Sequence, residues 1–100
     1  MIPEKSKKLF IDKYVDFGGD KFYNFLENYG ENEIGKKKKV SPELELLGYY
    51  NKFLVLYRRD NNQVFLEIAK LFRRAAHKTY RVMLKRKIID INHKFLNLVG

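Results

Sequence analysis

Few side chains of this sequence could carry out catalysis. Cysteine is absent, which excludes thiolate nucleophiles, disulfides and cysteine-ligated zinc. The alcohol nucleophiles are Ser6, Ser41 and Thr79, and Ser41 is better explained as a helix cap. Of the two imidazoles, His77 lies among cations that would oppose a metal ion, and His93 has only Asp90 at a suitable spacing, so that the pair supplies too few ligands for a metal site. We therefore expect a protein that is not an enzyme and that has no catalytic residue, metal ion or cofactor.

The pattern most typical of a functional surface is a row of cationic side chains on one side of a predicted helix. At 3.6 residues per turn they gather on one face, which only Glu67 interrupts at its N-terminal end. With a rise of about 1.5 Å per residue they extend over about 22 Å. Such a face could neutralise several phosphates of a nucleic acid and release their counterions. The predicted phosphate contacts are Lys70, Arg73, Arg74, Lys78, Arg81 and Lys85, with His77 among them.

Charge is distributed unevenly along the chain. In residues 1–50 nine lysines balance nine acids, whereas residues 51–100 hold twelve basic residues against three acids and so carry the whole net charge of +9. A basic half of this kind is typical of a surface that faces an anionic partner. An exposed loop expected over residues 30–40 adds four possible phosphate contacts, Lys36, Lys37, Lys38 and Lys39. Nucleic acid, either DNA or RNA, is therefore the first partner that the sequence predicts.

Other interpretations of these residues remain open. A basic helix face can be a solvated surface that aids solubility. The second functional hypothesis is a helical interaction or assembly subunit, which could be a homo-oligomer or bind an acidic protein. It rests on the predicted helix at 42–59, whose apolar residues surround most of the circumference, and on a change of the apolar phase after Leu84. Base-specific DNA recognition by Asn61, Asn62 and Gln63 has less support, because a turn and a helix cap already explain these residues.

One short stretch resembles a known family. Leu56-Tyr57-Arg58, followed by Phe72-Arg73-Arg74, is similar to the Leu-Tyr-Arg signature and downstream Phe-Arg element of mitochondrial assembly factors. Those proteins are small, basic and helical, and the resemblance implies binding to acyl carrier protein or to iron–sulfur assembly partners. In that family the motif opens the first helix, whereas here it closes a helix at mid-chain, and the two elements lie closer together. We assign no family from it.

Hydrophobic periodicity predicts the helices that precede the basic face. Apolar residues at helical spacing indicate a short helix over 7–17, which Gly18 and Gly19 end, and a second short helix that stops at Gly30. A third helix, Pro42–Arg59, begins with Ser41 as its cap. Because this third helix is apolar on most sides, we expect it at the centre of the core.

The longest predicted helix carries the basic face. Asp60 and Gln63 resemble a capping box, and the helix would run over about residues 61–87. Its predicted core side consists of Val64, Phe65, Ile68, Leu71, Phe72, Ala75, Ala76, Thr79, Val82 and Met83. Tyr80, with Tyr29 and Tyr49, is a candidate for exposure. After Leu84 the apolar phase changes, so residues 88–100 would form either a short fifth helix or a hairpin.

Length and composition set the class of protein. One hundred residues, of which 45% are hydrophobic, support a single domain over 1–100. No apolar run is long enough to cross a bilayer, and the charged N-terminus does not resemble a signal peptide. We expect an intracellular, cytoplasmic protein without a small-molecule substrate. The expected fold is all-α, a compact bundle of four to five helices with one long basic amphipathic helix.

Overall fold

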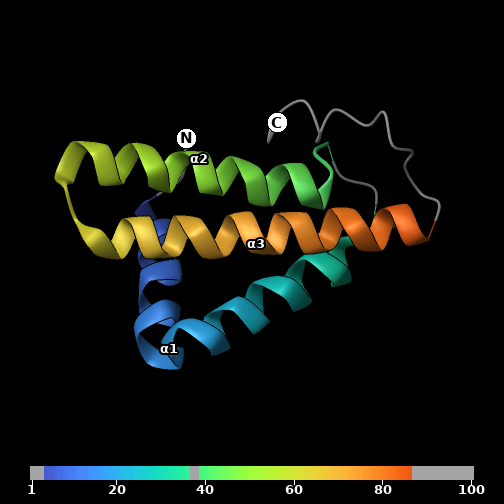
Figure 1. Ribbon diagram of the computed structural model, residues 1–100, viewed down its shortest axis with the longest axis horizontal. Helices are drawn as coiled ribbons and strands as arrows, with labels where there is room; N and C mark the ends of the chain where they lie inside the picture. Colours follow the sequence, from blue (N-terminus) through green and yellow to red (C-terminus); the bar gives the residue numbers. More distant parts are fainter. Residues whose placement is uncertain (1–3, 37–38, 87–100) are drawn as a thin grey trace.

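Three helices make up the part of the chain that the computed structural model describes, residues 4–36 and 39–86 (Figure 1). They are α1 (Glu4–Glu33), α2 (Pro42–Asp60) and α3 (Gln63–Lys85). Gly18 has non-helical backbone angles, φ 72° and ψ 166°, and divides α1 into two helical arms. The described residues thus form four helical segments and no strand, which confirms the all-α prediction. The predicted helix or hairpin over 88–100 lies outside the described residues.

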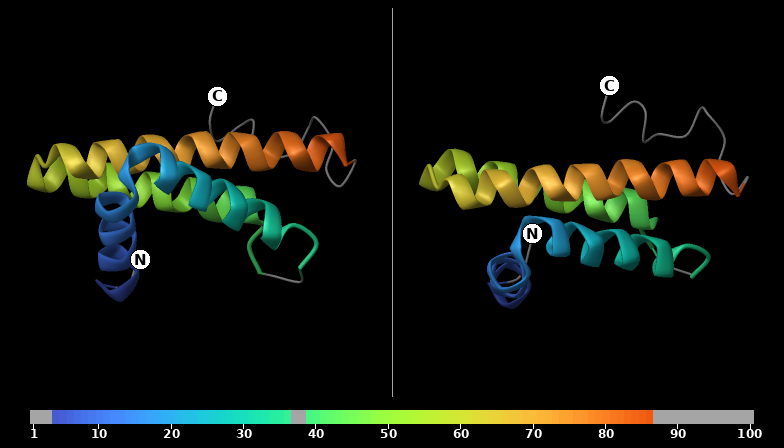
Figure 2. Two further views of the ribbon diagram at one scale, coloured as in Figure 1. Left: turned by 90° about the horizontal axis from the view of Figure 1, so that it is seen from below. Right: turned by 60° about the horizontal axis from the view of Figure 1, so that its bottom comes forward.

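The helix α3 lies between the other two. It packs along α2 on one side and against α1 on the other, whereas α1 and α2 touch little (Figure 1). The two arms of α1 meet at a steep angle, so that the first arm crosses the direction of α3 and the second runs along α3 (Figure 2). The Cα radius of gyration, 13.4 Å, is close to the ~13 Å of a compact domain of this length. The prediction that the Pro42–Arg59 helix is central is wrong.

The burial of α2 and α3 explains why α3 is central. Although apolar residues surround α2, it buries few of them, and Val55 is 57% exposed. The helix α3 contacts neighbours on two sides and therefore buries a wider arc than its predicted stripe, including Ala69 and Tyr80. Tyr80 is 4% exposed, so its predicted exposure is wrong. The nine buried residues of α3 are Phe65, Ile68, Ala69, Phe72, Ala75, Ala76, Thr79, Tyr80 and Met83.

Phenylalanine rings form the centre of the core. The centroid of the Phe72 ring on α3 lies 5.0 Å from that of Phe10 and 6.0 Å from that of Phe22, which belong to the two arms of α1. It lies 5.6 Å from that of Phe53 on α2. Aromatic pairs in these geometries contribute about 0.5–1.5 kcal/mol beyond the area that they bury. One side chain of α3 thus contacts every other helical segment.

Two asparagines build the turn between α2 and α3. Asn61 adopts the left-handed conformation, φ 52°, and its N–H donates to the carbonyl four residues earlier at 2.7 Å. The side-chain oxygen of Asn62 accepts from the N–H two residues later at 3.0 Å and so caps α3. The predicted capping box of Asp60 and Gln63 is therefore wrong. The helix α2 extends through Asp60, which forms an ion pair with Arg59 instead.

The loop that contains residues 36–39, called the lysine-rich loop below, connects α1 to α2, and the helix ends on its two sides also differ from expectation. The helix α1 continues three residues past Gly30, because Gly30 is a packing residue and not a stop. A Cβ added there would overlap the Thr79 hydroxyl and lie 3.0 Å from Leu46 Cδ1. The helix α2 begins at Pro42 as expected, but the Ser41 hydroxyl forms no capping hydrogen bond. The loop is thus shorter than predicted.

Candidate anion-binding groove

The cationic side chains of α3 lie on the side of the helix that faces away from the core. Five of them are exposed, and His77 and Lys78 are half-buried. The structure therefore places the α3 residues selected from the sequence on one surface, over about 22 Å of helix. We refer to seven residues as the basic face: Lys70, Arg73, Arg74, His77, Lys78, Arg81 and Lys85.

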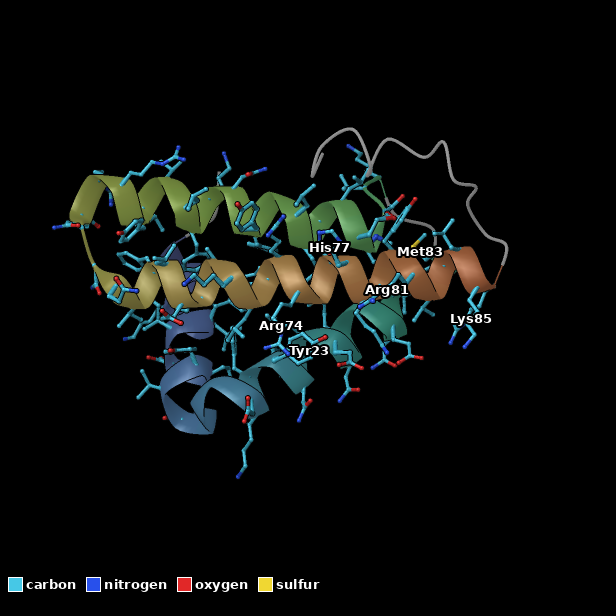
Figure 3. All side chains as sticks on the ribbon, in the orientation of Figure 1. Tyr23, Arg74, His77, Arg81, Met83 and Lys85 are labelled. Atoms are coloured by element: carbon cyan, nitrogen blue, oxygen red, sulfur yellow. The ribbon has the colours of Figure 1, made fainter. Side chains whose placement is uncertain are left out.

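Part of the basic face forms one wall of a groove, and the second arm of α1 forms the other. Figure 3 shows Arg74 and Arg81 on the side of α3 that faces α1, with Tyr23 beside Arg74. The groove has a volume of about 490 Å³. None of the described residues that line it is an acid, so positive charge is concentrated in a concave site. We call it the α1–α3 groove; its lining residues are Tyr23, Lys70, Arg73, Arg74, His77 and Arg81.

Tyr23 connects the two walls of the groove. The guanidinium carbon of Arg74 lies 4.1 Å from the centroid of the Tyr23 ring, a cation–π contact between α3 and α1. Glu27, one turn further along α1, forms a hydrogen bond with Tyr23 and is itself half-buried. The ring is thus held from both helices, and it holds the Arg74 side chain at the edge of the groove.

Two of the titratable groups that line the groove, Tyr23 and His77, have pKa values shifted towards their neutral forms. Burial raises the pKa of Tyr23 above its ordinary 10.0, and the nearby Glu27 carboxylate raises it further, against the opposing charges of Arg74 and Arg81. Burial lowers the pKa of His77 below its ordinary 6.5, and the charges of Arg73 and Arg81 lower it further. At neutral pH the phenol therefore keeps its proton, and the imidazole is largely uncharged.

The arginines of the groove are not neutralised by acids. In the described part of the chain, Arg73, Arg74 and Arg81 form no salt bridge. Lys70, at one end of the groove, is loosely paired with Glu67, with 3.9 Å between Nζ and Oε1. A guanidinium group can donate two parallel hydrogen bonds to one phosphate. The groove thus offers three unmatched bidentate donors to an anion.

The lysine-rich loop contributes less than the sequence predicted. Lys36 and Lys39 are exposed and do not line the groove. Lys36 Nζ lies 3.2 Å from Glu33 Oε2, so a carboxylate one turn earlier partly matches its charge. Lys37 and Lys38 lie outside the described residues. Within the described residues, the predicted phosphate contacts that belong to the candidate site are therefore those of the basic face alone.

Sequence reasoning missed two residues of the site, Tyr23 and Glu27. Tyr23 lies beside the predicted apolar stripe of its helix, and no sequence pattern links it to Arg74, fifty-one positions away. The one local signal is the spacing between Tyr23 and Glu27, which places the phenol and the carboxylate on the same helix face. That signal indicates a contact within α1 but gives no indication of the groove.

Other kinds of site find little support in the described residues. Thr79 is 1% exposed and packs beside Gly30, where no substrate could reach its hydroxyl. In residues 4–36 and 39–86, no group of three or more His, Asp or Glu side chains is placed to hold a metal ion. No helix in these ranges has both the length and the hydropathy needed to cross a membrane.

The arrangement can thus bind an anion by charge and by multiple N–H donors, with the α1–α3 groove as its most concentrated point. Comparison with known proteins adds no second line of support. No protein-family model, curated protein or solved structure matches this chain.

Proposed function

We propose that this chain is an intracellular, non-enzymatic nucleic-acid-binding protein that contacts phosphates through α3. The observation that carries the proposal is the positive charge on the exposed side of that helix, which only Glu67 interrupts and where three arginines have no described acidic partner. Surface helices of ordinary proteins alternate acids and bases. The proposed contacts are Lys70, Arg73, Arg74, Lys78, Arg81 and Lys85.

The length of the basic face supports a backbone-binding mode. About 22 Å of helix is comparable to the span of several consecutive phosphates, since a duplex carries a negative charge per about 1.7 Å of its axis. Each phosphate that a cation neutralises releases counterions, and the free energy of binding then depends on salt. We expect binding through the backbone, with little discrimination between base sequences.

The test is fluorescence anisotropy of labelled duplex DNA, single-stranded DNA and an RNA hairpin across a salt series. We expect binding that persists near physiological salt, with a log–log slope that corresponds to roughly four or more neutralised phosphates. Changing Arg73, Arg74 and Arg81 together to Glu should weaken binding by at least about tenfold. On duplex DNA the slope should become shallower by about 0.9 for each phosphate that the variant no longer neutralises.

A matched control separates the position of the charges from their sum. Lys52, Arg58 and Arg59 are exposed on α2 or at its end, and changing all three to Glu gives a protein of the same net charge as the α3 variant. We expect this control to retain most of the affinity and its salt slope. Equal reductions of affinity in the two variants would show that net charge alone attracts the nucleic acid, which would overturn the proposal.

The second functional hypothesis, a helical assembly subunit with an acidic protein partner, uses the same basic face. It becomes the better explanation if nucleic acid binds only at low salt and regardless of type. Its self-associating form requires an apolar contact, for which α2 offers the 57% exposed Val55. Sedimentation at high protein concentration tests that form, and a strict monomer would contradict it.

A further inference from the structure

The basic face is not uniform, and the difference lies in where its cations point. Lys78 and Lys85 belong to the face but not to the lining of the α1–α3 groove. The lining cations come from successive turns of α3, starting at Lys70 and ending at Arg81, about 16 Å of helix. A helix that only followed a phosphate backbone would need a ridge of cations, whereas here five nitrogen-bearing side chains line one wall of a hollow of about 490 Å³.

The charge in the groove exceeds what an internal phosphate would match. Arg73, Arg74 and Arg81 have no salt-bridge partner among the described residues, and Lys70 is only loosely paired. An internal phosphodiester carries a single negative charge. A phosphate monoester carries about −1.5 to −2 at pH 7 and presents three strong acceptor oxygens. The charge of the groove thus fits a monoester better than a diester.

The far wall of the groove positions part of this charge. The Tyr23 hydroxyl, which keeps its proton at neutral pH, donates to the Glu27 carboxylate, and the ring contact of 4.1 Å holds Arg74 beside it. His77 is half-buried in the same lining and lies close enough to Arg73 and Arg81 for their charges to act on it. Several cations on one helix, one of them held in place by an aromatic ring of another helix, can contact a terminal phosphate group, which is accessible from more directions than a phosphate within a strand.

We infer that the α1–α3 groove binds the terminal phosphate monoester of a nucleic-acid strand, with Arg73, Arg74 and Arg81 as its principal donors. This inference rests on the proposed function and adds to it a preference for phosphorylated strand ends. Lys78 and Lys85, outside the groove, contact the internal phosphates that follow.

The test compares a short single-stranded DNA that has a 5′ phosphate with the same strand that has a 5′ hydroxyl. We expect the wild-type protein to bind the phosphorylated strand about tenfold more tightly, the size of effect that one charged hydrogen-bonded group contributes. Arg74→Gln together with Arg81→Gln should reduce this ratio to near unity. Lys85→Gln should weaken binding of both strands equally and leave the ratio unchanged.

The two proposals fail in different ways in this experiment. Equal affinity for both strands would overturn the strand-end inference and leave the nucleic-acid proposal intact, whereas binding of neither strand would overturn both. Binding of the hydroxyl strand also reports that each variant is folded. Inorganic phosphate and a nucleoside monophosphate serve as competitors. If either displaced the phosphorylated strand at equal concentration, the groove would be a site for free phosphate compounds and the assignment to strand ends would be wrong.

Discussion

Gly30 is a residue at which all three helices come into close contact. Its Cα lies against Thr79 of α3 and Leu46 of α2, and all three residues are buried. We expect Gly30→Ala to lower the free energy of unfolding by about 1–3 kcal/mol, because the new methyl group must displace packed side chains. Urea denaturation followed by circular dichroism would measure the change.

Gly48→Ala is the matched control for this substitution. Gly48 also lies inside a helix, but an added Cβ there meets no atom within 4 Å. Alanine should then stabilise α2 by about 0.5–1 kcal/mol, because glycine is a poor helix former. If both substitutions stabilised the protein, the close contact at Gly30 would not exist in solution.

His77 gives the stability of the protein a pH dependence. In the folded state the pKa of His77 lies below its ordinary 6.5, because of burial and the charges of Arg73 and Arg81, and unfolding restores a value of about 6.5. The unfolded chain therefore binds the proton more readily. The contribution of neutral His77 to the free energy of unfolding is fully present above about pH 6.5. It is lost as the pH falls from there towards the lower pKa of the folded state.

The measurement is the urea midpoint at about pH 7.5 and about pH 5.5, on either side of the ordinary pKa. We expect the midpoint to fall less for His77→Gln than for the wild-type protein, since glutamine has no proton to gain. The carboxylates titrate alike in both proteins and cancel in the comparison. A fall of the same size in both would show that His77 is not perturbed by its neighbours.

Among the elements, α1 depends on one backbone conformation. Gly18, with φ 72° and ψ 166°, lies in a region that is almost restricted to glycine, and a Cβ there would meet no other atom within 4 Å. Gly18→Ala should therefore destabilise the protein by about 1–3 kcal/mol through the backbone alone. Thermal unfolding would measure this cost.

Gly19→Ala is the comparison for Gly18→Ala. Gly19 has the same free space around it and no positive φ, so alanine should be tolerated or slightly stabilising. Equal stability of the two variants would mean that the kink does not need the special conformation of Gly18.

The elements can be predicted from sequence wherever the signal is local. Gly18 and Gly19 mark the break in α1, and Pro42 marks the start of α2, because both effects act on the backbone of the residue itself. The sequence pattern favours Asp60 over Asn62 as the cap of α3. In the structure Asp60 is still part of α2, so the next helix begins later and Asn62 caps it. The local pattern does not show how far α2 extends. At Gly30 the pattern predicts a stop, because a glycine that permits close packing has the same local pattern as one that ends a helix.

At the scale of the whole molecule, the sequence does not predict which helices are neighbours. The period of apolar residues gives the direction of a buried side but not the number of helices that cover it. For this reason the apolar pattern predicts that α2 is the central helix, whereas in the structure the central helix is α3. The cations of the site can be selected from their spacing on one helix. The groove cannot be predicted in this way, because it forms only when α1 packs against α3 and places Tyr23 beside Arg74.

The groove joins two parts of the fold that have separate origins in the chain. Tyr23 belongs to α1 and the cations to the α2–α3 hairpin, and at the far end the Arg86–Glu31 pair, 3.2 Å apart, connects the same two parts. An anion held by both walls would act as a noncovalent cross-link between α1 and the hairpin. By mass action, a ligand at a hundred times its Kd adds about 2.7 kcal/mol to the state that binds it. When an anion occupies the groove, the amide hydrogens of α1 should exchange more slowly with solvent, because α1 would detach from the hairpin less often.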